Sequence, residues 1–223
     1  MSIVEPLPPS RRDARLNREL FIRHAQTAFA EQGASASLEG IARSANRAIG
    51  TLYRHFPERT DLLVAVYGAT LRELLDDIEA TLETSGPWDG LCALLDVLCS
   101  AQMGDRGFSD FVSRRFPGDT RTEALHNRLC EVAERALTRA QNAGAVRPDV
   151  TNADLVMLLW ASSKIAEATG EVAPRVWRRN LYVALDGLRS GHDLPEPPLD
   201  DGQLYQVMAR LKSRTETPRE VRT

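Results

Sequence analysis

Five side chains that can bind a polyanion lie close together between residues 47 and 59: Arg47, Tyr53, Arg54, His55 and Arg59. A guanidinium group can pair with a phosphate. It can also donate two hydrogen bonds to one guanine, which discriminates against other bases by about 1–3 kcal/mol. The chemistry open to this stretch is therefore recognition of a nucleic acid.

Patterns typical of enzymes are missing from the sequence. The four histidines, His24, His55, His126 and His192, have no metal-like spacing with cysteines or acids. The chain has no phosphate-binding loop, no nucleophile elbow and no dinucleotide-binding fingerprint. We therefore expect no catalytic residues, no metal site and no cofactor.

Two short helices joined by a turn must position the basic residues. Apolar residues recur at helical spacing in both predicted helices: Leu38, Ile41, Ala42 and Ala45 in residues 38–45, and Ile49, Leu52 and Phe56 in residues 48–56. Ser37 can cap the first helix, and Asn46 tolerates the left-handed conformation that a tight turn needs. Pro57 ends the second helix. This is the helix-turn-helix plan, in which the second helix can enter a major groove.

The sequence GTLYRHFP, residues 50–57, resembles the hallmark of TetR-family transcriptional regulators, and the resemblance extends from Arg15 to Leu63. Three residues depart from the family pattern. Asn46 replaces a turn glycine, Arg47 replaces an apolar residue, and Ala48 replaces a capping serine. The missing cap should cost about 1 kcal/mol of helix stability.

The resemblance implies a double-stranded DNA operator as partner, and it implies roles for individual residues. Base edges are expected to face Arg47, Ala48, Thr51 and Arg54, whereas phosphates are expected to bind Ser37, Tyr53 and His55. Arg59 should grip the backbone with help from the positive end of its helix. Two alternatives stay open. Tyr53 can be a half-buried aromatic that packs within the N-terminal part of the chain (residues 1–60, called the head below), and His55 can be a buried structural histidine.

Charge is divided unevenly along the 223-residue chain, whose net charge is −3. Residues 1–60 hold nine arginines and six acids, and the rest holds nineteen bases and twenty-five acids, so only the head favours contact with phosphate. With no apolar run of eighteen residues and no signal pattern, we expect a cytoplasmic protein without membrane contact. Cys92 and Cys99, about 10 Å apart on one predicted helix, are too far apart for a disulfide. We interpret the cysteines as small buried residues, with a redox sensor as the alternative.

The fold class is all-α, because no stretch alternates like a strand. Further helices are expected over residues 15–32, 58–84, 88–103, 108–116, 120–143, 153–168 and 175–190, with a last one near 203–214. We divide the chain into a flexible arm (1–14), a helix-turn-helix DNA-binding domain (15–60), a ligand-binding and dimerisation domain (61–192) and a C-terminal extension with a short helix (193–223). Arg11, Arg12 and Arg15 either follow the DNA backbone or belong to a solvated tail.

The resemblance also implies two surfaces in the body. The last two long helices should form a four-helix bundle with a second copy, through Leu155, Leu158, Leu159, Ile165, Leu181, Leu185 and Leu188. The fourth to seventh helices should enclose a ligand pocket lined by Trp88, Met103, Phe108, Phe111, Phe116, Leu125, His126 and Trp160. Both sets can equally be ordinary core.

The sequence therefore indicates a homodimeric DNA-binding regulator, and the main hypothesis is a repressor that a small apolar effector releases from its operator. The alternative is a helical interaction module of the same fold that a protein partner regulates. A pocket favours the first hypothesis, and a filled core with an exposed apolar groove favours the second.

Overall fold

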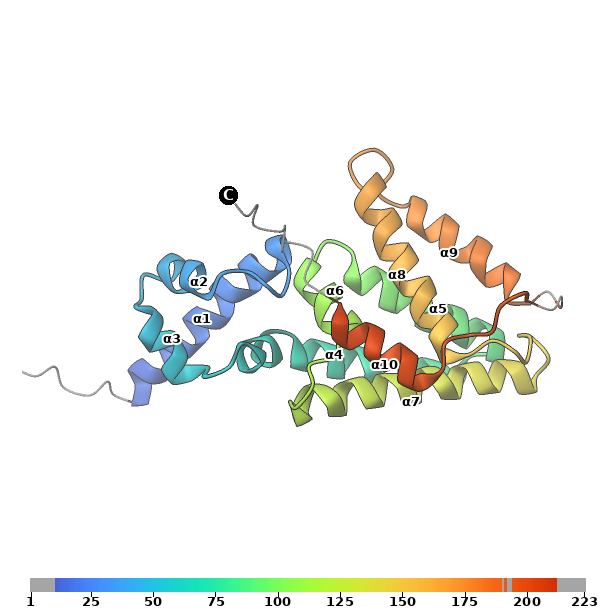
Figure 1. Cartoon of the computed structure of the whole chain (residues 1–223), viewed down its shortest axis with the longest axis horizontal. Coiled ribbons are helices and arrows are strands. Elements are labelled where there is room, and N and C mark those ends of the chain that lie inside the picture. The colour runs from blue at the N-terminus through green and yellow to red at the C-terminus, as the bar shows by residue number, and fades with distance from the viewer. Residues whose placement is uncertain (1–10, 190, 192–193, 212–223) are drawn as a thin grey trace, which may run out of the picture.

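The computed structural model describes residues 11–189, 191 and 194–211, and these residues form ten helices and no strand. The helices are α1 (Arg11–Gln32), α2 (Leu38–Ser44), α3 (Ile49–His55), α4 (Arg59–Thr84), α5 (Pro87–Gln102), α6 (Arg106–Ser113), α7 (Thr120–Asn142), α8 (Asn152–Thr169), α9 (Val176–Gly187) and α10 (Asp201–Arg210). Helices α1 to α3 gather at one end of the molecule, α5 and α7 to α10 form the other, and α6 lies between them against α1 (Figure 1).

Local chemistry fixes the bounds of the two short helices in the head. The hydroxyl of Ser37 accepts a hydrogen bond from the Gly40 backbone N–H at 3.1 Å and caps α2. Asn46 adopts a φ of 52°, the left-handed conformation expected of it in the turn. Ala48 gives α3 no side-chain cap. α3 is therefore held by packing, with Leu52 fully buried in the same core as Phe21 of α1.

Helix α4 joins the head to the body. It opens with a capping box in which Glu58 and Asp61 satisfy each other's backbone N–H groups. On its apolar face, Leu63, Leu71 and Leu75 are completely buried. One edge packs on α7, where Arg128 pairs with acids of α4; each such exposed pair contributes little alone.

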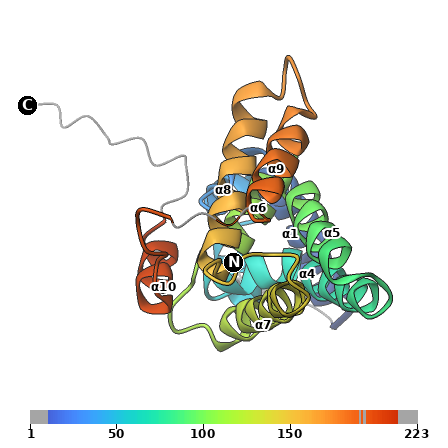
Figure 2. The same cartoon turned by 90° about the vertical axis from the view of Figure 1, so that its right-hand side faces the viewer.

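In the body, α8 packs along α9, and this pair projects away from the rest (Figures 1 and 2). Helix α10 lies on the other side of α8 (Figure 2). Leu204 and Met208 of α10 pack against Ala153 of α8 in a small apolar cluster. The carbonyl of Met208 accepts a hydrogen bond of 3.2 Å from the Arg115 backbone N–H, which ties α10 to the end of α6.

The helix bounds lie within a few residues of those predicted. One departure is α1, which begins at Arg11, so residues 11–14 of the predicted arm are helical. The rest of that arm (1–10), His192 and the end of the predicted last helix (212–214) lie outside the described residues. No helix that the structure describes is both long and apolar enough to span a bilayer.

Candidate DNA interface and ligand cavity

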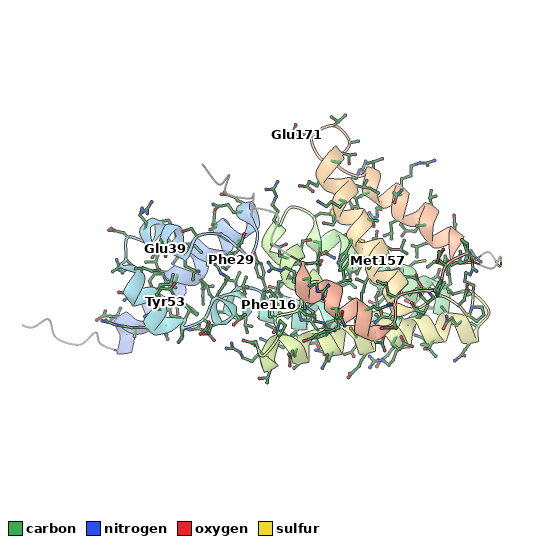
Figure 3. All side chains as sticks on the ribbon, in the orientation of Figure 1. Phe29, Glu39, Tyr53, Phe116, Met157 and Glu171 are labelled. Atoms are coloured by element: carbon green, nitrogen blue, oxygen red, sulfur yellow. The ribbon has the colours of Figure 1, made fainter. Side chains whose placement is uncertain are left out.

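The outer face of α3 and the turn before it are open to solvent. Arg47, Ala48 and Arg54 are exposed, Thr51 is half-buried, and Tyr53 keeps 45% of its surface accessible. Figure 3 shows Tyr53 at the head, far from Met157 in the body. A hollow open to solvent lies between α2 and α3, lined by Glu39, Ala42, Arg43, Asn46, Arg47, Ala48 and Ile49. The structure thus brings the predicted base-contacting residues together on one accessible surface.

Arg47 is held by protein groups. Its Nε donates to Asn17 Oδ1 of α1 at 2.8 Å, and one terminal nitrogen donates to the Asn46 carbonyl at 2.9 Å. These bonds orient the guanidinium and leave its second terminal nitrogen for a base edge or a phosphate. Arg43 lines the same hollow but was not predicted as a DNA contact. Its position in the chain, four residues before Arg47, could have indicated it.

Arg59 has a role beyond the one predicted. One of its terminal nitrogens donates to the carbonyl of Ala34 at 3.0 Å and to that of Ala36 at 2.6 Å. Burial is the main reason that its pKa is lowered. Arg59 therefore braces the loop between α1 and α2, a structural role that the sequence did not predict. Neutral carbonyls do not cancel its positive charge, so the expected contact with a phosphate stays a prediction. The family motif predicts a positive charge at position 59, but it does not predict which backbone carbonyls that side chain contacts.

Tyr53 and His55 point to different surroundings. The ring of His55 is half-buried, with its centroid 6.0 Å from that of Phe21. His55 is thus only half-buried, so both its structural role and its contact with a phosphate stay predictions, whereas the exposed Tyr53 has the accessibility that a phosphate contact needs. Ser37 uses its hydroxyl for the α2 cap and lies 3.2 Å from a Glu39 carboxylate oxygen.

The body contains an apolar cavity between α5, α6, α7, α8 and α10. Its lining consists of Leu94, Leu95, Leu98, Val112, Ser113, His126, Leu129, Cys130, Ala133, Asn152, Leu155, Val156, Leu159, Trp160 and Met208. Of the eight predicted pocket residues, only His126 and Trp160 belong to it. No lining residue comes from α4, so the predicted placement among the fourth to seventh helices is corrected to α5–α8 and α10.

The other six predicted pocket residues lie elsewhere, for a common reason: aromatic and large apolar residues pack where two helices meet. Phe108 and Phe111 lie with ring centroids 5.8 Å from that of Tyr67, in the contact between α6 and α4. The Trp88 ring stacks under the Arg189 guanidinium. Leu125 is buried in the core, and Met103 and Phe116 pack against it. Leu129 and Cys130 also line the cavity but were not predicted to do so, although they follow His126 by three and four residues on the same helix face. Nothing in the sequence indicated that Met208 lines it.

The cavity is narrow. Its empty volume is about 510 Å³ including the open mouth, but the centre of a water-sized sphere can occupy only about 40 Å³. One water needs about 10–15 Å³ on this measure, so the cavity as it stands holds about three. An organic ligand must therefore widen it. Met208, an unbranched and flexible side chain on α10, lines the wall that can adapt.

His126 is the one buried titratable side chain in this lining, with 1% of its surface exposed. Its Nδ1 lies 2.7 Å from the carbonyl oxygen of Thr122. Burial lowers its pKa most, and the Arg115 charge lowers it further, against the nearby carbonyls of Thr122, Phe111 and Val112. Among the described residues no group hydrogen-bonds to its Nε2. Elsewhere, burial raises the pKa of Cys92 and of Cys99 to about 11, which suits structural cysteines.

Four of the seven predicted dimer residues are buried inside the protomer: Leu155, Leu159, Leu181 and Leu185. They join α8 and α9 to the body and cannot meet a second copy; Leu155 and Leu159 line the cavity instead. Leu158, Ile165 and Leu188 remain partly accessible. The outer face of α9 exposes Tyr182 and Val183, at 45% and 61%. Helical periodicity identified these leucines as one apolar stripe, but it does not say whether a stripe faces the core of the protomer or a second copy.

Comparison with known proteins agrees with this architecture. Residues 21–66 match the family described as bacterial regulatory proteins, tetR family, and residues 86–190 match the C-terminal domain of SbtR-like transcriptional regulators. The chain is 27% identical over 180 residues to the HTH-type transcriptional regulator SrpR of Pseudomonas putida, covering 80% of this chain and 78% of that protein.

Two solved structures share the fold. The regulator FadR of Bacillus subtilis, in complex with stearoyl-CoA, superposes with a TM-score of 0.60 at 16% identity, covering 78% of this chain and 99% of that one. RolR, in complex with resorcinol, gives a TM-score of 0.50 at 17% identity, covering 91% and 97%. The two family matches span both the helix-turn-helix and most of the helical body, and the chain belongs to the TetR family of transcriptional regulators.

Proposed function

We propose that the protein is a homodimeric repressor that binds a palindromic DNA operator through α3 and leaves it when a small apolar ligand enters the body. In this proposal residues 15–60 bind DNA, residues 61–192 bind ligand and a second copy, and the protein acts in the cytoplasm, where its operator is. The observation that carries it is the separation of an exposed α3 from an apolar cavity, with α4 and α6 between them.

The DNA contacts follow from what α3 exposes. Arg54 and Thr51 can meet base edges, and Tyr53 can meet a phosphate, since Arg54 and Tyr53 are exposed, Thr51 is half-buried, and α3 lies at the end of the molecule (Figure 1). Two copies would place one α3 in each of two successive major grooves, with half-site centres about 34–36 Å apart or a multiple of that distance.

The dimer contact is expected on the outer face of α8 and α9. Tyr182 and Val183 of α9 supply exposed large apolar side chains, and Leu158 and Ile165 of the adjacent helix α8 are partly accessible. This pair of helices projects from the body, where a second copy can reach it (Figure 2). An accessible patch of aromatic and aliphatic residues is typical of the centre of an interface.

Release by ligand is supported by the cavity and by the position of α6. Val112 and Ser113 at the end of α6 line the cavity, and Asp110 of the same helix accepts a hydrogen bond of 2.8 Å from the Ala34 N–H next to α1. A ligand that widens the cavity therefore acts on an element bonded to the head. Proteins of this fold have been solved with stearoyl-CoA and with resorcinol, so the fold accommodates small molecules.

The test is selection of binding sites from a random duplex library by the purified protein, followed by footprinting and measurement of mass in solution. We expect a palindromic site protected by a dimer, and lower affinity in the presence of an effector. A monomer that selects no palindrome would contradict the proposal. Specific operator binding that responds to a protein partner and to no small molecule would support the interaction-module alternative.

A further inference from the structure

The tautomer of His126 follows from one short contact. A backbone carbonyl oxygen can only accept a hydrogen bond, and Thr122 O lies 2.7 Å from Nδ1 of His126. Nδ1 therefore carries a proton. Burial, which lowers the pKa of this side chain, keeps the ring neutral near pH 7. In a neutral imidazole with its proton on Nδ1, the other nitrogen, Nε2, is a hydrogen-bond acceptor.

That acceptor is buried without a protein donor. His126 is 1% exposed, and no donor within the part of the chain that the structure describes reaches Nε2. A buried polar atom without a partner costs free energy, whereas a water or a ligand hydroxyl that donates to it removes the cost. His126 lines the cavity, but Nε2 itself has almost no accessible surface, so such a group reaches it only when the cavity widens.

The rest of the lining decides what the remainder of a ligand looks like. Leu94 and Leu98 of α5, Val112 of α6, Leu155 of α8 and Met208 of α10 surround the space. No lining residue carries a carboxylate, an ammonium or a guanidinium group. A cation would lose its hydration without gaining a partner there. The Arg115 guanidinium lies next to the lining, 3.4 Å from the sulfur of Cys130, but is not itself part of it, so we take the ligand to be neutral and mostly apolar.

We infer that the ligand of this cavity is an uncharged apolar molecule with a hydroxyl group, and that this hydroxyl donates its hydrogen bond to Nε2 of His126. The inference rests on the proposed function for the location of the effector site, and it adds the chemical class. Ketones, ethers and halides offer only lone pairs to Nε2, so they are rejected relative to the matching alcohol or phenol. His126 is thus the residue that sets specificity.

Matched pairs of compounds test the donor directly. Phenol and anisole, 4-propylphenol and 4-propylanisole, and 1-naphthol and 1-methoxynaphthalene differ only by methylation of the hydroxyl. We expect calorimetric titration of the full-length protein to give tighter binding of the hydroxyl member by roughly 5–150-fold, the range that corresponds to one buried unsatisfied acceptor. In His126→Phe, which keeps a ring and removes the acceptor, this preference should vanish while the ether binds as before.

A measurement on the unmodified protein covers the case in which His126→Phe does not fold. Nitrogen-15 NMR of labelled histidine separates a protonated from an unprotonated ring nitrogen. We expect His126 to be protonated on Nδ1 only, and the Nε2 signal to move toward that of a hydrogen-bonded nitrogen when 4-propylphenol is added. Fluorination of the apolar end of that compound should leave this change intact.

Three outcomes would overturn the inference. The first is a proton on Nε2, which could bond to the carbonyls of Phe111 and Val112 near the ring. The others are equal binding of the two members of each pair, and no binding by any hydroxyl compound. The proposed function fails by a separate route, because operator selection uses none of these compounds. A protein that binds its operator but shows no hydroxyl preference keeps the repressor proposal and loses only the ligand class.

Discussion

Gly107 of α6 lies so close to Phe29 of α1 that a Cβ atom at position 107 would stand 2.6 Å from the Phe29 Cβ and 3.0 Å from its carbonyl carbon. The two helices therefore meet almost backbone to backbone. Tyr67 of α4 closes the same contact, and its hydroxyl donates to Asp105 at 2.8 Å, the residue that caps α6. The head is thus joined to the body through α6 as well as through α4.

The first prediction concerns this contact. Gly107→Ala should lower the free energy of unfolding by about 1–3 kcal/mol, the usual cost of overpacking, because Phe29 backbone atoms cannot yield. Thermal unfolding followed by circular dichroism measures the loss. Gly187→Ala is the matched control, since a Cβ there meets nothing within 4 Å and the helix gains propensity. Equal melting temperatures for the two variants would show that α1 and α6 are not tightly packed.

The second prediction separates the two arginines of the head. Arg59→Ala should lower the free energy of unfolding by about 1–3 kcal/mol, because the carbonyls of Ala34 and Ala36 lose their donor. Arg54→Ala should leave the melting temperature unchanged. It should instead weaken operator binding by about 1–3 kcal/mol and relax preference at one base position.

Melting curves and binding to a panel of operator variants measure both effects. If Arg54→Ala unfolds early while Arg59→Ala changes only DNA affinity, the assignment of the two arginines is reversed.

The sequence predicted the helices well because each signal for a helix is local. Ser37, Asn46 and Pro57 act through their own backbone or that of a neighbour, so the head could be drawn without knowing what packs on it. The same locality explains why the structural role of Arg59 was not predicted. Its partners, Ala34 and Ala36, lie more than twenty residues away in a loop whose position depends on the whole head.

The cavity and the dimer face were harder to predict, because both depend on which side of a helix turns inward. Leu155 and Leu181 have the spacing of an interface stripe, but the packing of α8 and α9 on the body buries them. Met208 reaches the cavity only because α10 folds back across α8, and the intervening proline-rich stretch does not encode that direction. His126 was found because an imidazole on an apolar helix face is conspicuous in any packing.

The third prediction tests the dimer contact. Tyr182→Asp together with Val183→Asp should give a monomer at micromolar concentration, because two charges replace apolar side chains at the centre of the expected interface. Light scattering coupled to gel filtration measures the mass. Val207→Asp on α10, also an exposed valine, serves as the control and should remain a dimer. A double variant that stays dimeric would place the interface elsewhere.

The fourth prediction concerns acid stability at the start of α7. Asp119 accepts hydrogen bonds from the N–H groups of Arg121 and Thr122, at 3.1 and 3.0 Å, and one of its carboxylate oxygens lies 2.6 Å from the Arg121 guanidinium. Chiefly the bond from Arg121 lowers the pKa of Asp119 to about 2. A carboxyl with a lowered folded pKa stabilises the fold above its unfolded value near pH 4 and ceases to do so as the pH falls through about 2.

Asp119→Asn should therefore cost about 1 kcal/mol at pH 7, discounted because Arg121 is half-exposed, and almost nothing near pH 2. Urea unfolding at both pH values measures the two differences, with Asp77→Asn on the exposed side of α4 as control. A constant difference across this pH range would mean that Asp119 acts by shape and not by charge.

The last prediction concerns how the cavity communicates with the head. Asp110 of α6 accepts a hydrogen bond of 2.8 Å from the Ala34 N–H, whereas its neighbour Ser109 lies 3.2 Å from Gln102 Oε1 and 3.3 Å from the Ser163 hydroxyl, both in the body. If ligand moves α6 and α6 moves the head through this bond, Asp110→Ala should weaken the coupling between effector and operator. A typical coupling is about 1–3 kcal/mol, and linkage requires operator to weaken effector binding by the same factor as effector weakens operator binding.

Titration of an effector with and without operator should show that factor fall toward one in Asp110→Ala, with effector affinity for the free protein unchanged. Ser109→Ala should keep the factor of the unmodified protein. An unchanged factor in Asp110→Ala would leave α4 as the path between the two sites.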